Sequence, residues 1–270
     1  MSADLWIDGV LYENYTGRLS RRIADKFIGW LEIKQARFTN GVDMGCGTGA
    51  LSEALLTNSV CDSLISLDRS PAYMSFAKQR ISSSVVEFVT GDVQNTSLPT
   101  GTYALVVSGL VLNFVDSPEK MLREMRRLGR SGGVLGLYIW DFADGMEPIR
   151  KFWDAAHKCE APHVREFDAG IRFPICQRDN LLQSITDAGW REPEVVPIEI
   201  DARFASFDEY WAPFLSGQGT GPAFAVSLTD DMREKVRKTL MPLVTDSPDK
   251  PFTLRARAWA AKGIASGSLN

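Results

Sequence analysis

A glycine-rich turn early in the chain is the first feature with the chemistry of a ligand-binding site. Residues 41–56 read GVDMGCGTGALSEALL, and Gly45 and Gly47 fall where a predicted strand passes into a predicted helix. Glycine has no Cβ atom, so its backbone can approach a ligand closely. With Ala50 the spacing matches the dinucleotide fingerprint G-x-G-x-x-A, and with Gly49 it reads equally as G-x-G-x-G. A P-loop is excluded because no Gly-Lys-Ser/Thr follows. The turn alone leaves the identity of the ligand open.

Three aspartates discriminate between the possible ligands. Asp43 lies two residues before the first glycine, where its charge would oppose a pyrophosphate but suits an ammonium or sulfonium group. Asp68 ends the next predicted strand, where an acid can accept hydrogen bonds from both ribose hydroxyls. Asp92 follows the third strand and is placed to accept a hydrogen bond from an adenine amino group. Dinucleotide enzymes do not need an acid at this position. The Tyr-x-x-x-Lys pair of short-chain dehydrogenases fails, because Ala77 stands four residues after Tyr73. The residues therefore favour S-adenosylmethionine (SAM).

The hydrophobic pattern predicts the elements that must position these residues. Residues 17–32 carry apolar side chains at i, i+4 steps, which indicates an amphipathic helix. Strands and helices then alternate, and this predicts an α/β fold with a doubly wound, mostly parallel, seven-stranded Rossmann-like sheet. Ligands on such sheets bind beyond the carboxyl ends of the strands, at the switch point. The strands are expected within residues 38–44, 63–70, 85–93, 103–112, 134–142, 194–204 and 251–263.

The second half of the chain interrupts this alternation with helical segments. Residues 1–140 are expected to hold the N-terminal helices and the SAM-binding core. Two insertions, residues 141–177 and 206–248, are expected to form a helical lid. Residues 178–204 and 249–264 would complete the core sheet.

Four segments taken together resemble the class I SAM-dependent methyltransferases. The closest group is the ubiquinone-biosynthesis type (type 11), which acts mainly on small molecules. The segments are VDMGCGTGALS, SLDRSPAYMSFAK, GDVQNTSLP and YALVVSGLVLNFVDSPEKMLREMRRLGRSGG, and the resemblance covers about residues 15–142. The runs YIWDFADGM, FWDAA and YWAPFLSGQG are similar to bacterial and fungal members without a settled substrate. The resemblance therefore implies the cofactor and the reaction type but names no acceptor.

The resemblance implies a set of SAM contacts around the glycine turn. Gly45 and Gly47 would let the backbone approach the methionine part of SAM, while Asp43 orders that loop. Asp68 would hold the ribose, and Arg69 would lie beside the adenine.

Further contacts are implied at the next strand ends. Asp92 and the amide of Val93 would read the adenine edge. Ser108 and Gly109, after the fourth strand, would offer backbone groups to the ammonium end of SAM. The N-terminal segment YTGRLSRR matches the family only loosely. This match implies that Tyr15 and Arg18 close over the SAM carboxylate.

Methyl transfer is an in-line displacement, so the protein must mainly align donor and acceptor and exclude water. An aromatic lid suits that task. A general base is needed only when the acceptor arrives protonated. His157 follows Trp153 by four residues on one helix face and is the candidate base, while packing or surface exposure is the alternative. The predicted pocket walls are Trp140, Phe152, Trp153, Trp211 and Phe214, for which a plain core role is the alternative.

Composition and motifs argue against several classes of binding partner. A net charge of −4 and a pI near 5.4 provide no field to attract phosphate backbones. The fourth strand ends in SGLVLN and not in the Asp/Asn-Pro-Pro-aromatic motif of nucleobase methyltransferases, which argues against nucleic acid. The four cysteines form no C-x-x-C pair, so we expect reduced thiols, a cytoplasmic location and no metal. Neither a signal peptide nor an apolar run of about 20 residues is found, so no membrane partner is expected.

The sequence thus predicts a SAM-dependent methyltransferase that acts on oxygen, nitrogen or carbon of a small organic acceptor, as a monomer or homodimer. Two rival hypotheses stay open. One is a SAM-fold enzyme that binds SAM but catalyses a non-methylating reaction such as a cyclisation. The other is a non-catalytic SAM-binding module.

Overall fold

The computed structural model describes residues 16–32 and 37–266 of the chain. Two compact units can be distinguished in it. Among the described residues, the core unit comprises residues 20–32, 37–139, 175–198 and 258–266, and the helical unit comprises residues 16–19, 140–174 and 199–257. We describe each unit by itself.

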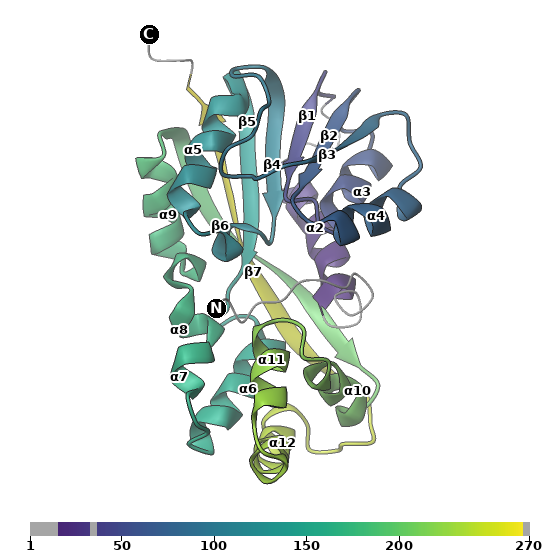
Figure 1. Cartoon of the computed structure of the whole chain (residues 1–270), viewed down its shortest axis with the longest axis vertical. Coiled ribbons are helices and arrows are strands. Elements are labelled where there is room, and N and C mark those ends of the chain that lie inside the picture. Colours follow the sequence, from purple (N-terminus) through teal and green to yellow (C-terminus); the bar gives the residue numbers. More distant parts are fainter. Residues whose placement is uncertain (1–15, 33–36, 267–270) are drawn as a thin grey trace. The chain divides into compact units, whose positions relative to one another are not determined.

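A seven-stranded sheet with the order β3-β2-β1-β4-β5-β7-β6 organises the fold (Figure 1). β1 pairs in parallel with β2 on one side and with β4 on the other. The chain therefore winds outward from β1 to β3 and then returns to place β4 beside β1, which makes the gap between β1 and β4 the switch point. The predicted doubly wound, mostly parallel α/β sheet is confirmed. The strands are β1 Gly41–Met44, β2 Leu64–Asp68, β3 Val86–Thr90, β4 Tyr103–Gly109, β5 Gly129–Trp140, β6 Trp190–Phe204 and β7 Phe252–Ala265.

Amphipathic helices cover the sheet of the core unit. In α2 the predicted apolar face is buried, and the ring centroid of Phe27 lies 4.8 Å from that of Tyr138 on β5. α4 packs on β2 and β3, and α5 packs on β4 and α9. The helices of this unit are α2 Arg18–Trp30, which begins at the boundary, α3 Ala50–Thr57, α4 Pro71–Arg80, α5 Pro118–Leu128 and α9 Arg178–Asp187, with a short 3-10 turn η2 Leu112–Phe114.

The helical unit packs around an aromatic cluster. Phe152 on α6 stacks on Phe214 with ring centroids 4.5 Å apart, and the neighbouring Trp153 lies 5.2 Å from Phe224 on α11. All five aromatic residues predicted as pocket walls are buried, and their role as walls stays a prediction. The helices here are α6 Glu147–Lys158, α7 Val164–Phe167, α8 Ala169–Arg172, α10 Phe207–Trp211, α11 Thr220–Ser227 and α12 Asp230–Val244, with the 3-10 turns η3 Pro174–Cys176 and η4 Ala212–Leu215.

One boundary differs from the sequence prediction. The fifth strand was expected within residues 134–142, but α5 stops at Leu128 and Gly129, the first residue of the segment GRSGG, already pairs with Tyr103. The register shifts between Tyr103 and Leu105, because Tyr103 pairs with Gly129 whereas Leu105 pairs with Val134. Gly133 is required there because a Cβ atom would lie 2.9 Å from the carbonyl oxygen of Tyr103. The glycines therefore begin a strand.

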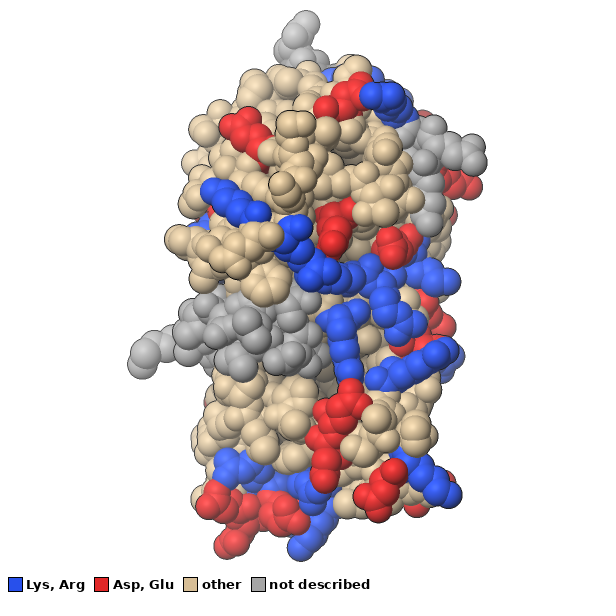
Figure 2. All heavy atoms as spheres, turned by 90° about the vertical axis from the view of Figure 1, so that its right-hand side faces the viewer, with Lys and Arg blue, Asp and Glu red and all other residues tan. Residues whose placement is uncertain are grey.

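Acidic and basic side chains are interspersed on the face drawn in Figure 2. In the core unit, Arg21 and Arg80 both form ion pairs with Glu53 Oε2, at 2.5 and 3.0 Å. In the described part of the chain no helix is long and apolar enough to cross a membrane. No group of three or more His, Cys, Asp or Glu side chains that could hold a metal occurs among the same residues.

Candidate functional site

The glycine turn after β1 forms the floor of the candidate site. Gly45 and Gly47 have φ angles of +78° and +53°, in the left-handed region that favours glycine. At Gly45 a Cβ atom would lie 2.5 Å from Cγ2 of Val111, so packing alone requires glycine there. At Gly47 a Cβ atom would have no neighbour nearer than Tyr73, at 3.9 Å. At Gly47 the positive φ accounts for the glycine, and the open space beside it leaves the backbone accessible to a ligand.

Asp43 places a fully buried carboxyl group beneath this turn. The Ser52 hydroxyl donates to its Oδ2 at 2.6 Å and lies 2.8 Å from the Ser66 hydroxyl. The other oxygen, Oδ1, is buried without a hydrogen-bond partner. The pKa of Asp43 is raised to about 7. Burial is the main cause and the charge of Asp68 adds to it, while the hydrogen bond from Ser52 acts in the opposite direction. An unpaired buried acceptor is costly, so it marks a place where a donor from a ligand would be favourable.

Asp68, at the end of β2, holds the glycine turn from the side. Its Oδ2 accepts from the Gly47 amide at 2.9 Å and its Oδ1 from the Ser70 amide at 2.8 Å. Burial raises the pKa of this carboxyl, and these two hydrogen bonds oppose the rise. Each carboxylate oxygen offers two acceptor sites, so capacity remains for ribose hydroxyls. Asp68 is thus a tether for the turn as well as the predicted ribose ligand, and its neighbour Arg69 is exposed.

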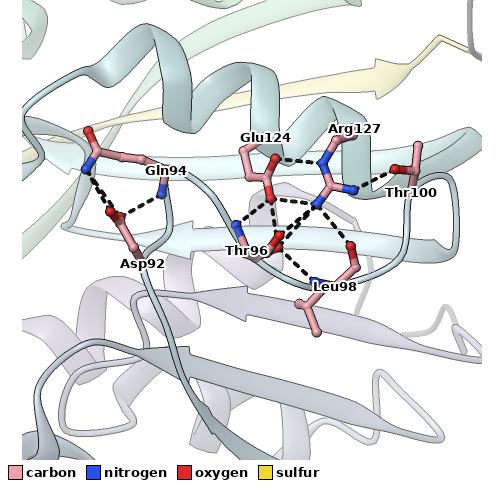
Figure 3. A network of polar contacts seen from close by, with 7 residues as sticks. All are labelled: Asp92, Gln94, Thr96, Leu98, Thr100, Glu124 and Arg127. Carbon is pink, nitrogen blue, oxygen red and sulfur yellow. Dashed lines mark hydrogen bonds and ion pairs between the residues drawn. The ribbon is translucent and has the colours of Figure 1, made fainter.

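Asp92 follows β3 and carries an exposed carboxylate (Figure 3). Its Oδ1 accepts from the Gln94 amide at 2.9 Å and from Gln94 Nε2 at 3.2 Å. The Gly91 amide donates to the Asp68 carbonyl at 3.1 Å, so the ends of β2 and β3 are joined next to both acids. Val93, the residue after Asp92, is buried.

Ser108 lies at the end of β4, across the switch point from β1. Its hydroxyl donates to the Met44 carbonyl at 2.6 Å, so the hydroxyl hydrogen is used within the protein. Gly109 is packed so closely that a Cβ atom would lie 2.4 Å from the Tyr138 hydroxyl oxygen. Leu110 then adopts a φ of +62°, a strained conformation for a residue with a side chain.

Sequence reasoning missed Asn113, which follows this kink on η2. The residue is 6% exposed, and its Nδ2 is buried without a hydrogen-bond partner. Val111, two residues earlier, is the residue that packs against Gly45, so this segment lies against the glycine turn. The available signal was a single amide within the apolar run GLVLNF immediately after a predicted strand end.

A serine at the N-cap of a helix usually accepts a hydrogen bond from a backbone amide through its hydroxyl, and Ser117 does not. It does stand at the N-cap position of α5, but its hydroxyl donates to Glu119 Oε2 at 3.1 Å and caps no backbone amide. The Ser117 amide instead donates to Gln94 Oε1 at 2.8 Å. The start of α5 is therefore bound to the loop that carries Asp92.

His157, the candidate base, belongs to α6 in the helical unit. Its Nε2 lies 2.8 Å from Oδ2 of Asp168, whose carboxylate also accepts from both terminal nitrogens of Arg150 at 2.9 and 2.8 Å. Burial would raise the pKa of Asp168, but the hydrogen bonds from Arg150 and His157 hold it below its usual value. This imidazole is therefore part of an ion network, and its role as a base stays a prediction.

Of the two N-terminal residues that were expected to close over the ligand, Tyr15 lies outside the described residues. Arg18 pairs with Glu209 Oε1 at 2.6 Å and lies over the Phe204 ring at 4.8 Å, within the helical unit. Its contact with a ligand carboxylate also stays a prediction.

Part of the chain is similar to known methyltransferases. Residues 42–137 match a family model described as a methyltransferase domain, and Asp43 to Asn113 lie inside the matched region. A malonyl-[acyl-carrier protein] O-methyltransferase from Enterobacter lignolyticus is 30% identical over 149 residues, 55% of this chain and 56% of the relative. Its counterpart from Paenibacillus sp. is 27% identical over 188 residues, 58% of this chain and 68% of the relative. The chain thus spans little more than half the length of the first of these relatives and 68% of the second.

The fold also matches a solved structure. A putative methyltransferase from an antibiotic biosynthesis pathway of Anabaena variabilis has a TM-score of 0.61 and 18% identity, covering 88% of this chain and 96% of that one. At this identity the similarity concerns the fold.

Proposed function

We propose that this chain, which carries a class I SAM-dependent methyltransferase domain, transfers the methyl group of SAM to a small organic acceptor. The observation that carries the proposal is the set of acids around the glycine turn. Asp43, Asp68 and Asp92 stand at or beside the carboxyl ends of three neighbouring parallel strands, next to a turn whose backbone is accessible at Gly47. This pattern suits a ligand with a cationic end, a ribose and an adenine.

The residues present fit SAM in their donor and acceptor types. Asp68 keeps acceptor capacity for the ribose hydroxyls after binding Gly47 and Ser70. The unpaired Oδ1 of Asp43 suits the ammonium end, and the unpaired Nδ2 of Asn113 suits an oxygen acceptor such as the SAM carboxylate. When bound, SAM supplies an electrophilic methyl group on a sulfonium. The protein's own contribution is to orient it and to keep water away from the acceptor.

The first acceptors to test are carboxylates, free or carried as acyl thioesters. The relatives named above are malonyl-[acyl-carrier protein] O-methyltransferases, and this activity makes a carboxylate the leading acceptor class to test. A carboxylate has an ordinary pKa near 4, so it is ionised at neutral pH and needs no general base. Under this proposal His157 has a structural role on α6, and turnover should not depend on its imidazole.

A turnover screen with labelled SAM tests the proposal. Small organic acids, acyl thioesters, phenols and amines are incubated with the full chain, and S-adenosylhomocysteine and methylated products are both quantified. Methyl transfer predicts the two in equal amounts for at least one acceptor. A product that forms without S-adenosylhomocysteine would indicate a non-methylating reaction, and SAM binding without any product across the screen would favour a binding module.

A further inference from the structure

Gln94 contacts both the predicted adenine-reading acid, as Figure 3 shows, and the backbone at the start of α5. Its side-chain Nε2 donates to Asp92 Oδ1 at 3.2 Å and approaches Oδ2 at 3.4 Å, and its backbone amide donates to Oδ1 at 2.9 Å. At the other end of the same side chain, Oε1 accepts from the Ser117 amide at 2.8 Å. One amide group thus holds the carboxylate of Asp92 and the first turn of α5 together.

The rest of this loop is fixed to the same helix. Glu124 Oε1 accepts from the amide and hydroxyl of Thr96 at 2.8 and 2.7 Å. Arg127, paired with Glu124 at 2.7 Å, donates to the Leu98 carbonyl at 3.0 Å and to the Thr100 hydroxyl at 2.6 Å. Burial would raise the pKa of Glu124, but its hydrogen bonds from Arg127 and Thr96 hold the pKa low, so the anchor is an ionised carboxylate. α5 therefore acts as a rigid support for the loop that carries Asp92.

This arrangement determines how Asp92 is presented. The carboxylate is exposed, and an exposed carboxylate without such contacts would rotate and lose that freedom when it bound a ligand. Oδ1 already receives two hydrogen bonds, whereas Oδ2 receives a single long one. The oxygen with the larger remaining acceptor capacity is therefore Oδ2.

We propose that Gln94 is a positioning residue that presents Asp92 Oδ2 as the acceptor for the exocyclic amino group of adenine, and that it thereby sets the preference for adenine over a base with a carbonyl at that position. The inference rests on the proposed SAM function and adds the residue that determines base selectivity. A carbonyl in place of the amino group would face a carboxylate oxygen, and two acceptors without a donor between them repel. A fixed carboxylate cannot turn away from that mismatch, whereas a freely rotating one can.

The test compares two ligands that differ only in the base. Calorimetry measures Kd for S-adenosylhomocysteine and for S-inosylhomocysteine, in which a carbonyl replaces the amino group. The unmodified protein should prefer the adenine ligand. In Gln94→Leu the affinity for S-adenosylhomocysteine should fall about tenfold, the loss expected for a hydrogen bond to a charged group, while that for S-inosylhomocysteine stays within about twofold.

Two further variants separate positioning from general support of the loop. Gln94→Glu keeps an oxygen that can accept from the Ser117 amide but replaces the donor to Asp92 with a like charge, so the base preference should be lost while the melting temperature is maintained. Thr100→Val removes one Arg127 contact from the same network and should leave the base preference unchanged. These variants keep the test decisive even where Gln94→Leu unfolds.

Equal loss of affinity for both ligands in the Gln94 variants would overturn the inference, because Gln94 would then only support the loop. An unmodified protein that binds both ligands equally well would overturn it too. Failure to bind either ligand is a different result, which removes the SAM function and this inference with it.

Discussion

Asp43 provides a prediction that joins folding stability to the ligand. In the folded protein its buried carboxyl has a pKa of about 7, whereas an unfolded chain restores a value near 3.9. Between these two values the folded state binds the proton more tightly than the unfolded state does. Asp43 therefore lowers the free energy of unfolding least below pH 4. Its destabilising effect grows as the pH rises and becomes constant above about pH 7.5.

The size of the effect follows from the two pKa values. A separation of about 3 units corresponds to about 4 kcal/mol over the whole range, and about 2.5 kcal/mol of this should appear between pH 5 and pH 8. Asp43→Asn removes the titration, so the free energy of unfolding of this variant should rise relative to the unmodified protein by that amount over the same pH range. Any constant cost of the buried amide shifts the curve without changing this slope.

Urea unfolding at several pH values between 5 and 8 measures the difference. The exposed Asp249→Asn reports the effect of removing one acidic charge at the surface. Saturating S-adenosylhomocysteine, whose ammonium group favours the ionised carboxylate, should flatten the pH dependence of the unmodified protein. If Asp43→Asn and the unmodified protein lose stability in parallel with pH, the argument from the buried unpaired carboxylate is refuted.

Three further predictions concern ligand binding. Asp68→Ala should weaken S-adenosylhomocysteine binding by about 1.5–3 kcal/mol, since two ribose hydroxyls lose a charged acceptor; an unchanged Kd in calorimetry would remove Asp68 from the site. Asn113→Leu should weaken S-adenosylhomocysteine about tenfold but leave methylthioadenosine, which lacks the amino-acid end, within about twofold; equal loss for both would place Asn113 elsewhere. Alanine at either glycine is strained by the positive φ, but only at Gly45 would its Cβ atom also meet a neighbour at 2.5 Å, so Gly45→Ala should lower the melting temperature more than Gly47→Ala does. Gly47→Ala should bind S-adenosylhomocysteine at least about tenfold more weakly, and the reverse order of stabilities would contradict the assignment of Gly47 to the ligand.

Local pattern was sufficient to predict the sheet and its switch point. The alternation of apolar strands with helices requires parallel pairing, and the acids after β2 and β3 fall at the same edge because parallel strands end there together. The start of β5 was placed too late, since GRSGG reads as a helix stop when the neighbouring strand is unknown. Pairing with Tyr103 decides that boundary, and pairing is a property of the folded chain.

The residues missed at the site share the same limitation. Asn113 stands out only once its burial and its unpaired Nδ2 are known. The second function of Asp68, as a tether for Gly47, joins residues 21 positions apart. The link from Gln94 to the Ser117 amide spans 23 positions. Such contacts depend on tertiary structure and have no local sequence signal.

Simultaneous quantification of S-adenosylhomocysteine and methylated product tests the central claim most directly. With methyl-labelled SAM and a carboxylate acceptor drawn from free acids and acyl thioesters, the proposed function predicts label in the product and one S-adenosylhomocysteine for each methyl group transferred. Product that carries no label, or acceptor turnover with SAM left intact, would contradict it.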